Sequence, residues 1–243
     1  MELKVYKDYN ALSQHVADEI FALIKNKPDA VICLASGDSP RGTCQLLAER
    51  AISEKLDLSE FTFIGLDEWV GIPRDNEGSC RFFFESLLVK PLHLSPGQVH
   101  FFDALSENPA RECEAMDKII FEKGGIDLMI VGIGMNGHIG FNEPGVSFDN
   151  YSHVIDLDES TITVGQKYFK GAVTLKQGIT LGLKHLMESK KVVVIANGSK
   201  KAEVIKKAVD GKISNQFPAT IIQTHPQGVV MVDEEAAALI NNK

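Results

Sequence analysis

The sequence predicts one doubly wound α/β domain over residues 1–243, with a mostly parallel central sheet and helices on both faces in three layers. Two observations lead to this fold class. Apolar runs of strand length alternate along the chain with helical patterns, and each run is continuously apolar. A strand that is apolar on both sides is typical of a parallel sheet covered on both faces. With 44% hydrophobic residues, the chain also has enough apolar side chains for a large core.

Five apolar runs are predicted as the strands of this sheet. They span residues 30–35, 61–66, 126–131, 191–196 and 228–232. Parallel neighbours need crossover connections, so we expect right-handed crossovers and a Rossmann-like architecture. No internal repeat, low-complexity segment or obvious linker interrupts the order.

Helical patterns fill the segments between these strands. After the first strand, Ser39 is predicted as the N-cap and Pro40 as the first helical residue. Leu46, Leu47 and Ala51 then recur at helical spacing. The other helical patterns cover residues 79–90, 107–122, about 197–209 and an alanine-rich stretch after residue 232.

The polar segments that follow the strands predict where a ligand binds. In doubly wound sheets, ligands bind beyond the carboxyl ends of the strands. Four segments rich in glycine and polar residues fall at those ends, and we expect them to meet in one site. They are residues 36–40, 67–69, 132–145 and 197–201.

Charge and cysteine content exclude several classes of partner. The net charge of −8 disfavours a broad nucleic-acid surface, although a few cations and amides can still focus positive potential on an anionic small molecule. The chain shows neither a signal-peptide pattern nor an apolar run near the ~20 residues of a bilayer span, so we expect a cytoplasmic protein without membrane partners. The cysteines form no C-x-x-C pair, which indicates reduced, buried thiols rather than a zinc knuckle: Cys33, Cys44, Cys80 and Cys113.

The segment after the third strand combines a glycine pattern with several polar side chains. Gly132, Gly134 and Gly137 match the Gly-x-Gly-x-x-Gly fingerprint of dinucleotide-binding loops. Such a loop must open directly into a helix whose N-terminus holds the pyrophosphate. Here residues 138–145 contain two glycines and a proline, which is a poor helix start. We therefore interpret the segment as a polar active-site loop and expect no nicotinamide cofactor.

Three side chains in these segments are candidates for acid–base chemistry. Asp67, at the end of the second strand, suits a general base, with a helix cap or a solvated turn residue as the alternative. His138 can transfer protons near neutral pH, or it is a hydrogen-bonded structural residue. Glu143 lies five residues on, where the loop can fold it back to orient the His138 ring. A metal site would need Asp67 or His225 as a third ligand, and no recognised spacing supports it, so no metal is expected.

Two turns are predicted to hold an anion. Ser36, Gly37 and Ser39 offer hydroxyls and free amides beside a helix N-terminus. Residues 197–201 repeat this arrangement and add two lysines. Lys201 is placed to clamp a phosphate as a point charge, unless the two lysines are only a solvated helix face.

Two motifs give the chain a resemblance to a known family. The segment Leu66-Asp67-Glu68-Trp69-Val70-Gly71 and the loop from Gly132 to Pro144 resemble the glucosamine-6-phosphate deaminases of the glucosamine/galactosamine-6-phosphate isomerase family. The loop's Gly-His-Ile-x-Phe-Asn-Glu-Pro run is highly specific to that family. Supporting matches are Ser36-Gly37-x-Ser39-Pro40, Gly198-Ser199-x-Lys201 and Pro218-Ala219-x-x-x-x-Gln223-x-His225-Pro226, and the resemblance runs from about residue 2 to about residue 238.

The resemblance implies an isomerising deamination without a metal or an organic cofactor. Glucosamine 6-phosphate and water would give fructose 6-phosphate and ammonia. By this resemblance Asp67 moves a proton between C2 and C1 of the open-chain sugar, and His138 opens the pyranose ring with help from Glu143 and Asn136. It places the sugar phosphate on a further set of residues: Ser36, Gly37, Ser39, Gly134, Lys167 and Lys201.

Three residues depart from the family's pattern. Asn136 stands where some members have aspartate; an amide cannot take a proton, so we expect it to orient His138 or the substrate. Lys167 stands where arginine is expected, which removes bidentate phosphate binding. Asp38 replaces a small residue in the phosphate turn, and because its carboxylate would repel a phosphate, we expect it to point away and cap the helix.

Three alternative functions stay open at this point. A galactosamine-6-phosphate deaminase would differ mainly at contacts to the C4 hydroxyl, which the sequence does not resolve. A 6-phosphogluconolactonase shares the Gly-x-Gly-x-x-Gly-His run but normally continues with a serine-containing segment in place of residues 141–144. A sugar-phosphate sensor of a transcription regulator would carry a DNA-binding segment ahead of the sheet, where only about 28 residues precede the first predicted strand.

The segment after the Asn-Glu-Pro motif bears on regulation. Allosteric members of the family bind an acetylated sugar phosphate between subunits and use cationic residues in this segment. Residues 146–155 contain neither lysine nor arginine. Activation by N-acetylglucosamine 6-phosphate is therefore not expected, and the sequence leaves open whether the protein is a monomer or a homo-oligomer.

Overall fold

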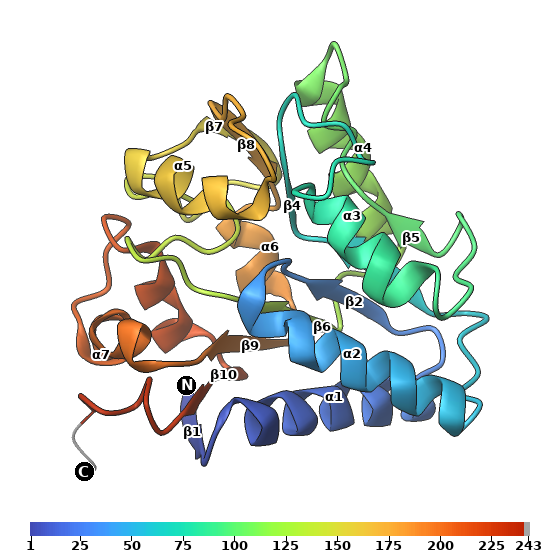
Figure 1. Ribbon diagram of the computed structural model, residues 1–243, viewed down its shortest axis with the longest axis horizontal. Coiled ribbons are helices and arrows are strands. Elements are labelled where there is room, and N and C mark those ends of the chain that lie inside the picture. Colours follow the sequence, from blue (N-terminus) through green and yellow to red (C-terminus); the bar gives the residue numbers. More distant parts are fainter. Residues whose placement is uncertain (241–243) are drawn as a thin grey trace.

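A parallel sheet of seven strands forms the centre of the computed structural model, which describes residues 1–240 (Figure 1). The strands run in the order β1-β10-β9-β6-β2-β3-β5, and the pairings between them are parallel. They span Glu2–Tyr6 (β1), Val31–Leu34 (β2), Thr62–Gly65 (β3), Val99–His100 (β5), Leu128–Val131 (β6), Lys191–Ala196 (β9) and Gly228–Asp233 (β10). Each of the five predicted apolar runs corresponds to one of these strands, and β10 extends one residue beyond its run, to Asp233.

Helices cover both faces of this sheet, which explains why its strands are continuously apolar (Figure 1). The α-helices are α1 (Tyr9–Asn26), α2 (Asp38–Ser53), α3 (Cys80–Phe84), α4 (Pro109–Glu122), α5 (Glu159–Gly165), α6 (Leu183–Glu188) and α7 (Ala202–Asp210). Ile32 and Leu34 of β2 pack with α1 and α2, whereas Val31 and Cys33 pack on the opposite face with α4, α6 and α7. The predicted doubly wound α/β fold class is confirmed.

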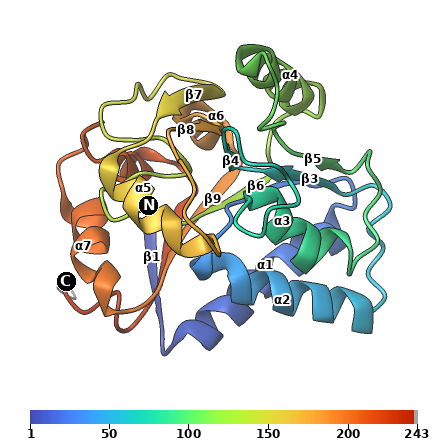
Figure 2. The same cartoon turned by 45° about the horizontal axis from the view of Figure 1, so that its top comes forward.

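A second, antiparallel sheet of three strands lies beside helix α5, and no sequence pattern predicts it (Figure 2). Its order is β4 (Asp67–Trp69), β8 (Gln177–Thr180) and β7 (His153–Asp156). The chain leaves the large sheet after β3, and Asp67 then pairs with Thr180 of β8. Trp69 packs on Phe141 with ring centroids 4.5 Å apart, so the glycine loop and the small sheet share a core. The carboxyl end of β3 is thereby fixed next to that loop.

Several local features differ from the sequence predictions. Helix α2 begins at Asp38, and its N-cap is Gly37 rather than the predicted Ser39. The Gly37 φ of +109° is a conformation that favours glycine. Ser39 and Pro40 therefore lie inside the first turn. The predicted helix over residues 79–90 divides into α3 and a π-helical turn, η1 (Glu85–Val89). Residues 234–239 form turns instead of a terminal helix, and the Asp233 side chain accepts a hydrogen bond from the Ala236 amide there. The remaining short helices are η2 (Gln166–Tyr168), η3 (Ser199–Lys201) and η4 (Pro218–Thr224).

The cysteines agree with the prediction of buried thiols. All four cysteines are buried and none forms a disulfide. No helix in the part of the chain that the structure describes is long and apolar enough to cross a membrane.

Candidate active site

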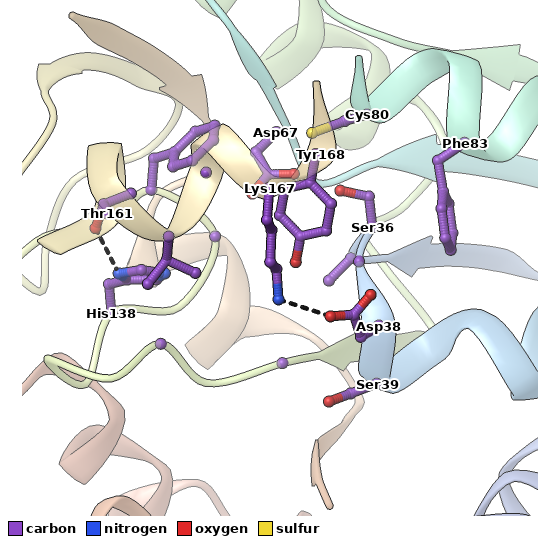
Figure 3. A pocket seen from close by; sticks show the side chains of 18 of the residues that line it. Ser36, Asp38, Ser39, Asp67, Cys80, Phe83, His138, Thr161, Lys167 and Tyr168 are labelled. Carbon is purple, nitrogen blue, oxygen red and sulfur yellow. Dashed lines mark hydrogen bonds and ion pairs between the residues drawn. The ribbon is translucent and has the colours of Figure 1, made fainter. Parts of the chain in front are cut away.

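A cavity of about 420 Å³ lies at the carboxyl ends of β2, β3 and β6, with helix α5 and η2 forming another wall (Figure 3). Residues from all four predicted polar segments line it. The sequence-predicted residues in the lining are Ser36, Gly37, Ser39, Asp67, Gly134, His138, Lys167 and Lys201. The structure therefore brings together segments that lie more than a hundred residues apart, at the edge of the sheet where the topology predicts a ligand.

Asp67 lies on the inner wall of this cavity (Figure 3). Its Oδ1 atom is buried and has no hydrogen-bond partner among residues 1–240. Burial, together with the nearby Glu68 charge, raises the Asp67 pKa to about 7, and the neighbouring Cys80 thiol opposes this shift. The residue starts a strand rather than a helix, so the helix-cap alternative is wrong. A carboxyl group with a pKa near neutrality is suited to accepting and returning a proton.

Glu68 is the neighbour of Asp67 in sequence but has a different environment. Its side chain is buried and accepts hydrogen bonds from the Ser79 hydroxyl at 2.6 Å and from the Cys80 and Arg81 amides. It therefore fixes the start of α3 to β4. Adjacent strand residues point to opposite faces, and this alternation places Asp67, but not Glu68, in the cavity lining.

The glycine loop places His138 over its own backbone. A Cβ atom built on Gly134 would lie 2.2 Å from the His138 ring, so the ring occupies space that only glycine at this position leaves free. Gly137 has a φ of +87°, a conformation that favours glycine. The loop also folds back, and Asn142 donates hydrogen bonds to the Ile139 and Leu181 carbonyls at 2.9 and 2.8 Å. The fingerprint glycines therefore shape a histidine loop, which agrees with the sequence interpretation.

The His138 ring faces a carboxylate and a hydroxyl. Its Nδ1 atom lies 3.4 Å from Glu143 Oε2 and 3.0 Å from Thr161 Oγ1. Asn136 joins this group, since its side-chain amide donates to Glu143 Oε2 at 2.9 Å and its carbonyl accepts from the His138 amide at 3.1 Å. Burial opposes ionisation of Glu143, but its contacts with His138, Thr161 and Asn136 outweigh burial and lower its pKa. A carboxylate beside Nδ1 favours the tautomer protonated there and leaves Nε2 to exchange protons.

The first predicted anion turn lies at the N-terminus of α2. Gly37 is the N-cap, and no side chain caps the helix. The Ser39 hydroxyl donates to Asn197 Oδ1 at 3.0 Å, which joins this turn to the end of β9. Lys201 reaches the same region and donates to the Ile133 carbonyl. Burial, and then the charge of Lys167, lower the Lys201 pKa to about 8.

The prediction that the amides of residues 197–201 hold an anion is wrong for Gly198 and Ser199. The Gly198 amide donates to both carboxylate oxygens of Asp233 at 3.0 Å, and the Ser199 amide donates to Glu235 at 3.2 Å. These amides are occupied by the chain's own carboxylates, because β10 ends beside β9 and its acidic residues reach the η3 terminus. Only Lys201 of residues 197–201 lines the cavity.

Asp38 also differs from its predicted position. It does not cap α2, and it lines the cavity instead of pointing away from it. Its Oδ2 atom accepts a hydrogen bond from Lys167 Nζ at 2.6 Å, which joins the first turn of α2 to η2 across the cavity (Figure 3). Although burial opposes it, this contact with Asp38 raises the Lys167 pKa. The negative charge that Asp38 brings to the phosphate turn is therefore paired with the positive charge of Lys167.

The metal alternative needed Asp67 or His225 as a third ligand. Asp67 lines the cavity with His138, whereas His225 lies elsewhere. Its ring is buried and its Nε2 atom lies 3.0 Å from the Ser189 carbonyl. Within residues 1–240, no three His, Cys, Asp or Glu side chains are grouped as metal ligands.

Several residues of the cavity carry no signal in the sequence. Thr161 and Tyr168 come from α5 and η2, a segment without a preceding apolar strand. Cys80 and Arg41 are also in the lining, on the first turns of α3 and α2. For Cys80, the only local hint is its place at the start of the predicted helix over residues 79–90, where Ser79 is the N-cap of α3. Contacts such as Thr161 with His138 depend on the tertiary fold.

The fold and the cavity together define an α/β enzyme that moves protons on a small anionic substrate. The chain belongs to the family of glucosamine-6-phosphate isomerases and 6-phosphogluconolactonases, whose pattern it matches over residues 7–231. This result confirms the resemblance found in the sequence. The enzymes of this family act on small sugar phosphates.

Similar proteins agree with this assignment over almost the whole chain. A glucosamine-6-phosphate deaminase of Clostridium perfringens is 40% identical over 241 residues, which cover 99% of this chain and 100% of the relative. One from Clostridium botulinum is 35% identical and covers 100% of both chains. The solved structure of a monomeric glucosamine-6-phosphate deaminase superimposes with a TM-score of 0.95 at 33% identity, covering 98% of this chain and 100% of that one. A 6-phosphogluconolactonase of Trypanosoma brucei, at 19% identity and a TM-score of 0.78, shares the fold alone.

Proposed function

We propose that this chain catalyses the isomerising deamination of glucosamine 6-phosphate, in which water is consumed and fructose 6-phosphate and ammonia are formed. The observation that carries the proposal is the buried Asp67 carboxyl, unpaired at Oδ1 among the described residues, in one cavity with the His138–Glu143 pair. Glucosamine-6-phosphate deaminases at 35–40% identity along the whole chain support it. We place this activity in a single cytoplasmic domain, consistent with the unpaired, buried cysteines.

Each step of the reaction has a group to perform it. His138, oriented by Glu143, takes the proton of the anomeric hydroxyl and gives a proton to the ring oxygen, which opens the pyranose. Asp67 removes the C2 proton and returns it to C1, while a proton passes from the amino nitrogen to the C1 oxygen, so the amino sugar becomes a 2-imine with a C1 hydroxyl by way of an enolamine. Water then adds at C2 and ammonia leaves, which gives the ketose phosphate. Asn136 positions these groups, because its side-chain amide is hydrogen-bonded to the Glu143 carboxylate and to the His138 backbone.

The phosphate lies at the other end of the cavity in this proposal. Backbone amides at Gly37 and Ser39 and the helix dipole of α2 favour an anion there, and Lys201 and Lys167 supply positive charge. Ser36 and Gly134 complete the substrate-binding wall. A lysine at position 167 binds as a point charge, so the site depends on the α2 amides for geometry.

The direct test is to incubate the protein separately with glucosamine 6-phosphate and galactosamine 6-phosphate and to measure ammonia and ketose phosphate. We expect both products, in equal amounts, from glucosamine 6-phosphate. Faster release from galactosamine 6-phosphate would reassign the substrate. No ammonia from either sugar, together with hydrolysis of 6-phosphogluconolactone, would replace the proposal.

The pH profile should report the Asp67 carboxyl. We expect kcat/KM to rise as the pH increases through about 7, because Asp67 must lose its proton before it can accept one. Cys80→Ala removes the thiol that lowers the Asp67 pKa, so the acid limb of this variant should move to higher pH. Cys113→Ala, at a buried cysteine outside the cavity, is the matched control. Superimposable limbs for wild type and Cys80→Ala would show that the thiol does not tune the base.

Regulation by the acetylated form of the substrate is not part of this proposal. We expect hyperbolic kinetics that N-acetylglucosamine 6-phosphate does not activate, because residues 146–155 carry no lysine or arginine to bind its phosphate. We also propose that the protein is a monomer, because the similar glucosamine-6-phosphate deaminase of known structure is described as monomeric. Initial rates with and without the compound, together with light scattering, test both statements. Sigmoidal kinetics relieved by the compound would contradict the absence of activation. An oligomer whose size does not depend on protein concentration would contradict the monomer.

A further inference from the structure

One carboxylate lies among the cations proposed to bind phosphate. Asp38 is the first residue of α2, and its Oδ2 atom lies 2.6 Å from Lys167 Nζ (Figure 3). Both side chains line the cavity, and both are accessible, with exposed fractions of 63% for Asp38 and 49% for Lys167. A phosphate that used the α2 amides and Lys167 would therefore arrive where Asp38 already holds the lysine.

Two lysines and one carboxylate influence one another at this position. Lys201 is close enough for the Lys167 charge to disfavour its protonated form and for the Asp38 charge to favour it. One carboxylate thus offsets part of the positive charge of two lysines. The contact with Lys167 is a side-chain pair in contact with solvent, so it exchanges partners readily, and its strength depends on salt.

We propose that Asp38 is an internal competitor of the substrate's phosphate: its carboxylate pairs with Lys167 and yields that lysine when the phosphate binds. Asp38 thereby sets how tightly the enzyme holds the 6-phosphate of substrate and product. This inference rests on the proposed function for the identity of the substrate, but its chemistry requires only a phosphate monoester or inorganic phosphate at the N-terminus of α2.

The competition has a defined direction. When a phosphate binds, Asp38 loses its partner and stays near a second anion, so the bound state carries a repulsion that an uncharged residue would not. Removing the charge should strengthen phosphate binding and slow its release. Because Asp38 lies at the phosphate end of the cavity and Asp67 at its inner wall, the proton-transfer step should change little.

Asp38→Asn tests this inference with little change in shape. We expect the KM for glucosamine 6-phosphate and the inhibition constant of inorganic phosphate to fall about 5- to 20-fold at low salt, with less change at high salt. We expect kcat to stay within about three-fold. Asp149→Asn is the matched control, since it also removes one exposed carboxylate paired with a lysine, Lys184 at 3.8 Å, but outside the cavity. It should leave both constants unchanged.

A double-mutant cycle identifies the route of the effect. In a Lys167→Met background the competition no longer exists, so Asp38→Asn should improve phosphate binding much less than in the wild type. An equal improvement in both backgrounds would show direct repulsion without competition and would overturn the proposal, as would unchanged constants in Asp38→Asn.

Calorimetric titration with inorganic phosphate and with fructose 6-phosphate separates this inference from the proposed function. If no amino sugar is deaminated but Asp38→Asn binds both ligands more tightly, the competition stands and the activity fails. If the enzyme is active but Asp38→Asn binds phosphate no better, the activity stands and the competition fails. If neither ligand binds to any variant, the phosphate site at α2 is wrong and the competition fails with it.

Discussion

Replacing Asp67 with asparagine should reduce kcat for glucosamine 6-phosphate by about 10³- to 10⁴-fold, because the amide cannot take the C2 proton. Binding of fructose 6-phosphate should stay within about five-fold, since the phosphate end of the cavity is formed by α2, η2 and Lys201. Stopped-flow or coupled assays measure the first quantity and calorimetry the second. Retained turnover would remove Asp67 from the role of base, and lost binding would show that it holds the substrate instead.

Protein stability provides the control for this variant. The Asp67 pKa is raised from 3.8 to about 7, so between these pH values the folded protein binds a proton that the unfolded chain has lost. The free energy of unfolding contributed by Asp67 therefore decreases as the pH rises through this range, and the cost is complete above it. Asp67→Asn removes a charge whose Oδ1 atom is buried without a partner among residues 1–240, so we expect its Tm at about pH 8 to equal or exceed that of the wild type. An inactive variant that is also more stable cannot owe its inactivity to unfolding.

The strands and the ligand-binding edge could be predicted from sequence because each depends on a local pattern. Ile32 and Leu34 face one helix layer and Val31 and Cys33 the other, so the apolar run itself records burial on both faces. The polar segments must then follow these strands, and parallel topology brings their ends together. Asp67, His138 and Lys201 were predicted in this way and line one cavity.

The small antiparallel sheet could not be predicted, because its strands lack a continuous apolar run. β7 reads His-Val-Ile-Asp and β8 Gln-Gly-Ile-Thr, and they become strands only by pairing with each other and with β4. A Cβ atom on Gly178 would lie 2.4 Å from the Phe141 ring, so this sheet packs directly on the glycine loop. Thr161 and Tyr168 reach the cavity from the α5–η2 segment between β7 and β8, which is why their place in the site was not visible in the sequence.

Two errors at the anion turns have a common electrostatic origin. The glycine and serine amides at 198–199 resemble a phosphate cradle, but Asp233 and Glu235 from the end of β10 already occupy them. Asp38 was expected to turn away, but Lys167 from η2 pairs with it. In both cases the partner comes from a distant segment, and local sequence shows only one half of the pair.

Replacing His138 with glutamine should separate ring opening from proton transfer. We expect kcat for deamination to fall about 10²-fold or more, because glutamine keeps hydrogen bonds but cannot exchange protons near neutral pH. Exchange of the C1 hydrogen of fructose 6-phosphate with deuterium from the solvent needs Asp67 and an open-chain ketose, which also forms without the enzyme. This exchange should therefore decrease less in His138→Gln than deamination does, whereas Asp67→Asn should lose both.

Thr161→Val is the matched control for the histidine, since it removes the hydroxyl 3.0 Å from Nδ1 and keeps the shape of the side chain. With Glu143 still 3.4 Å from Nδ1, the ring keeps a carboxylate to orient it, so we expect a loss of only about ten-fold in kcat. Nuclear magnetic resonance of the C1 hydrogen and ammonia release, measured on the same samples, give both rates. Equal losses of exchange and deamination in His138→Gln would mean that His138 acts in the same proton transfer as Asp67, because a group that only opens the ring does not touch the C1 hydrogen.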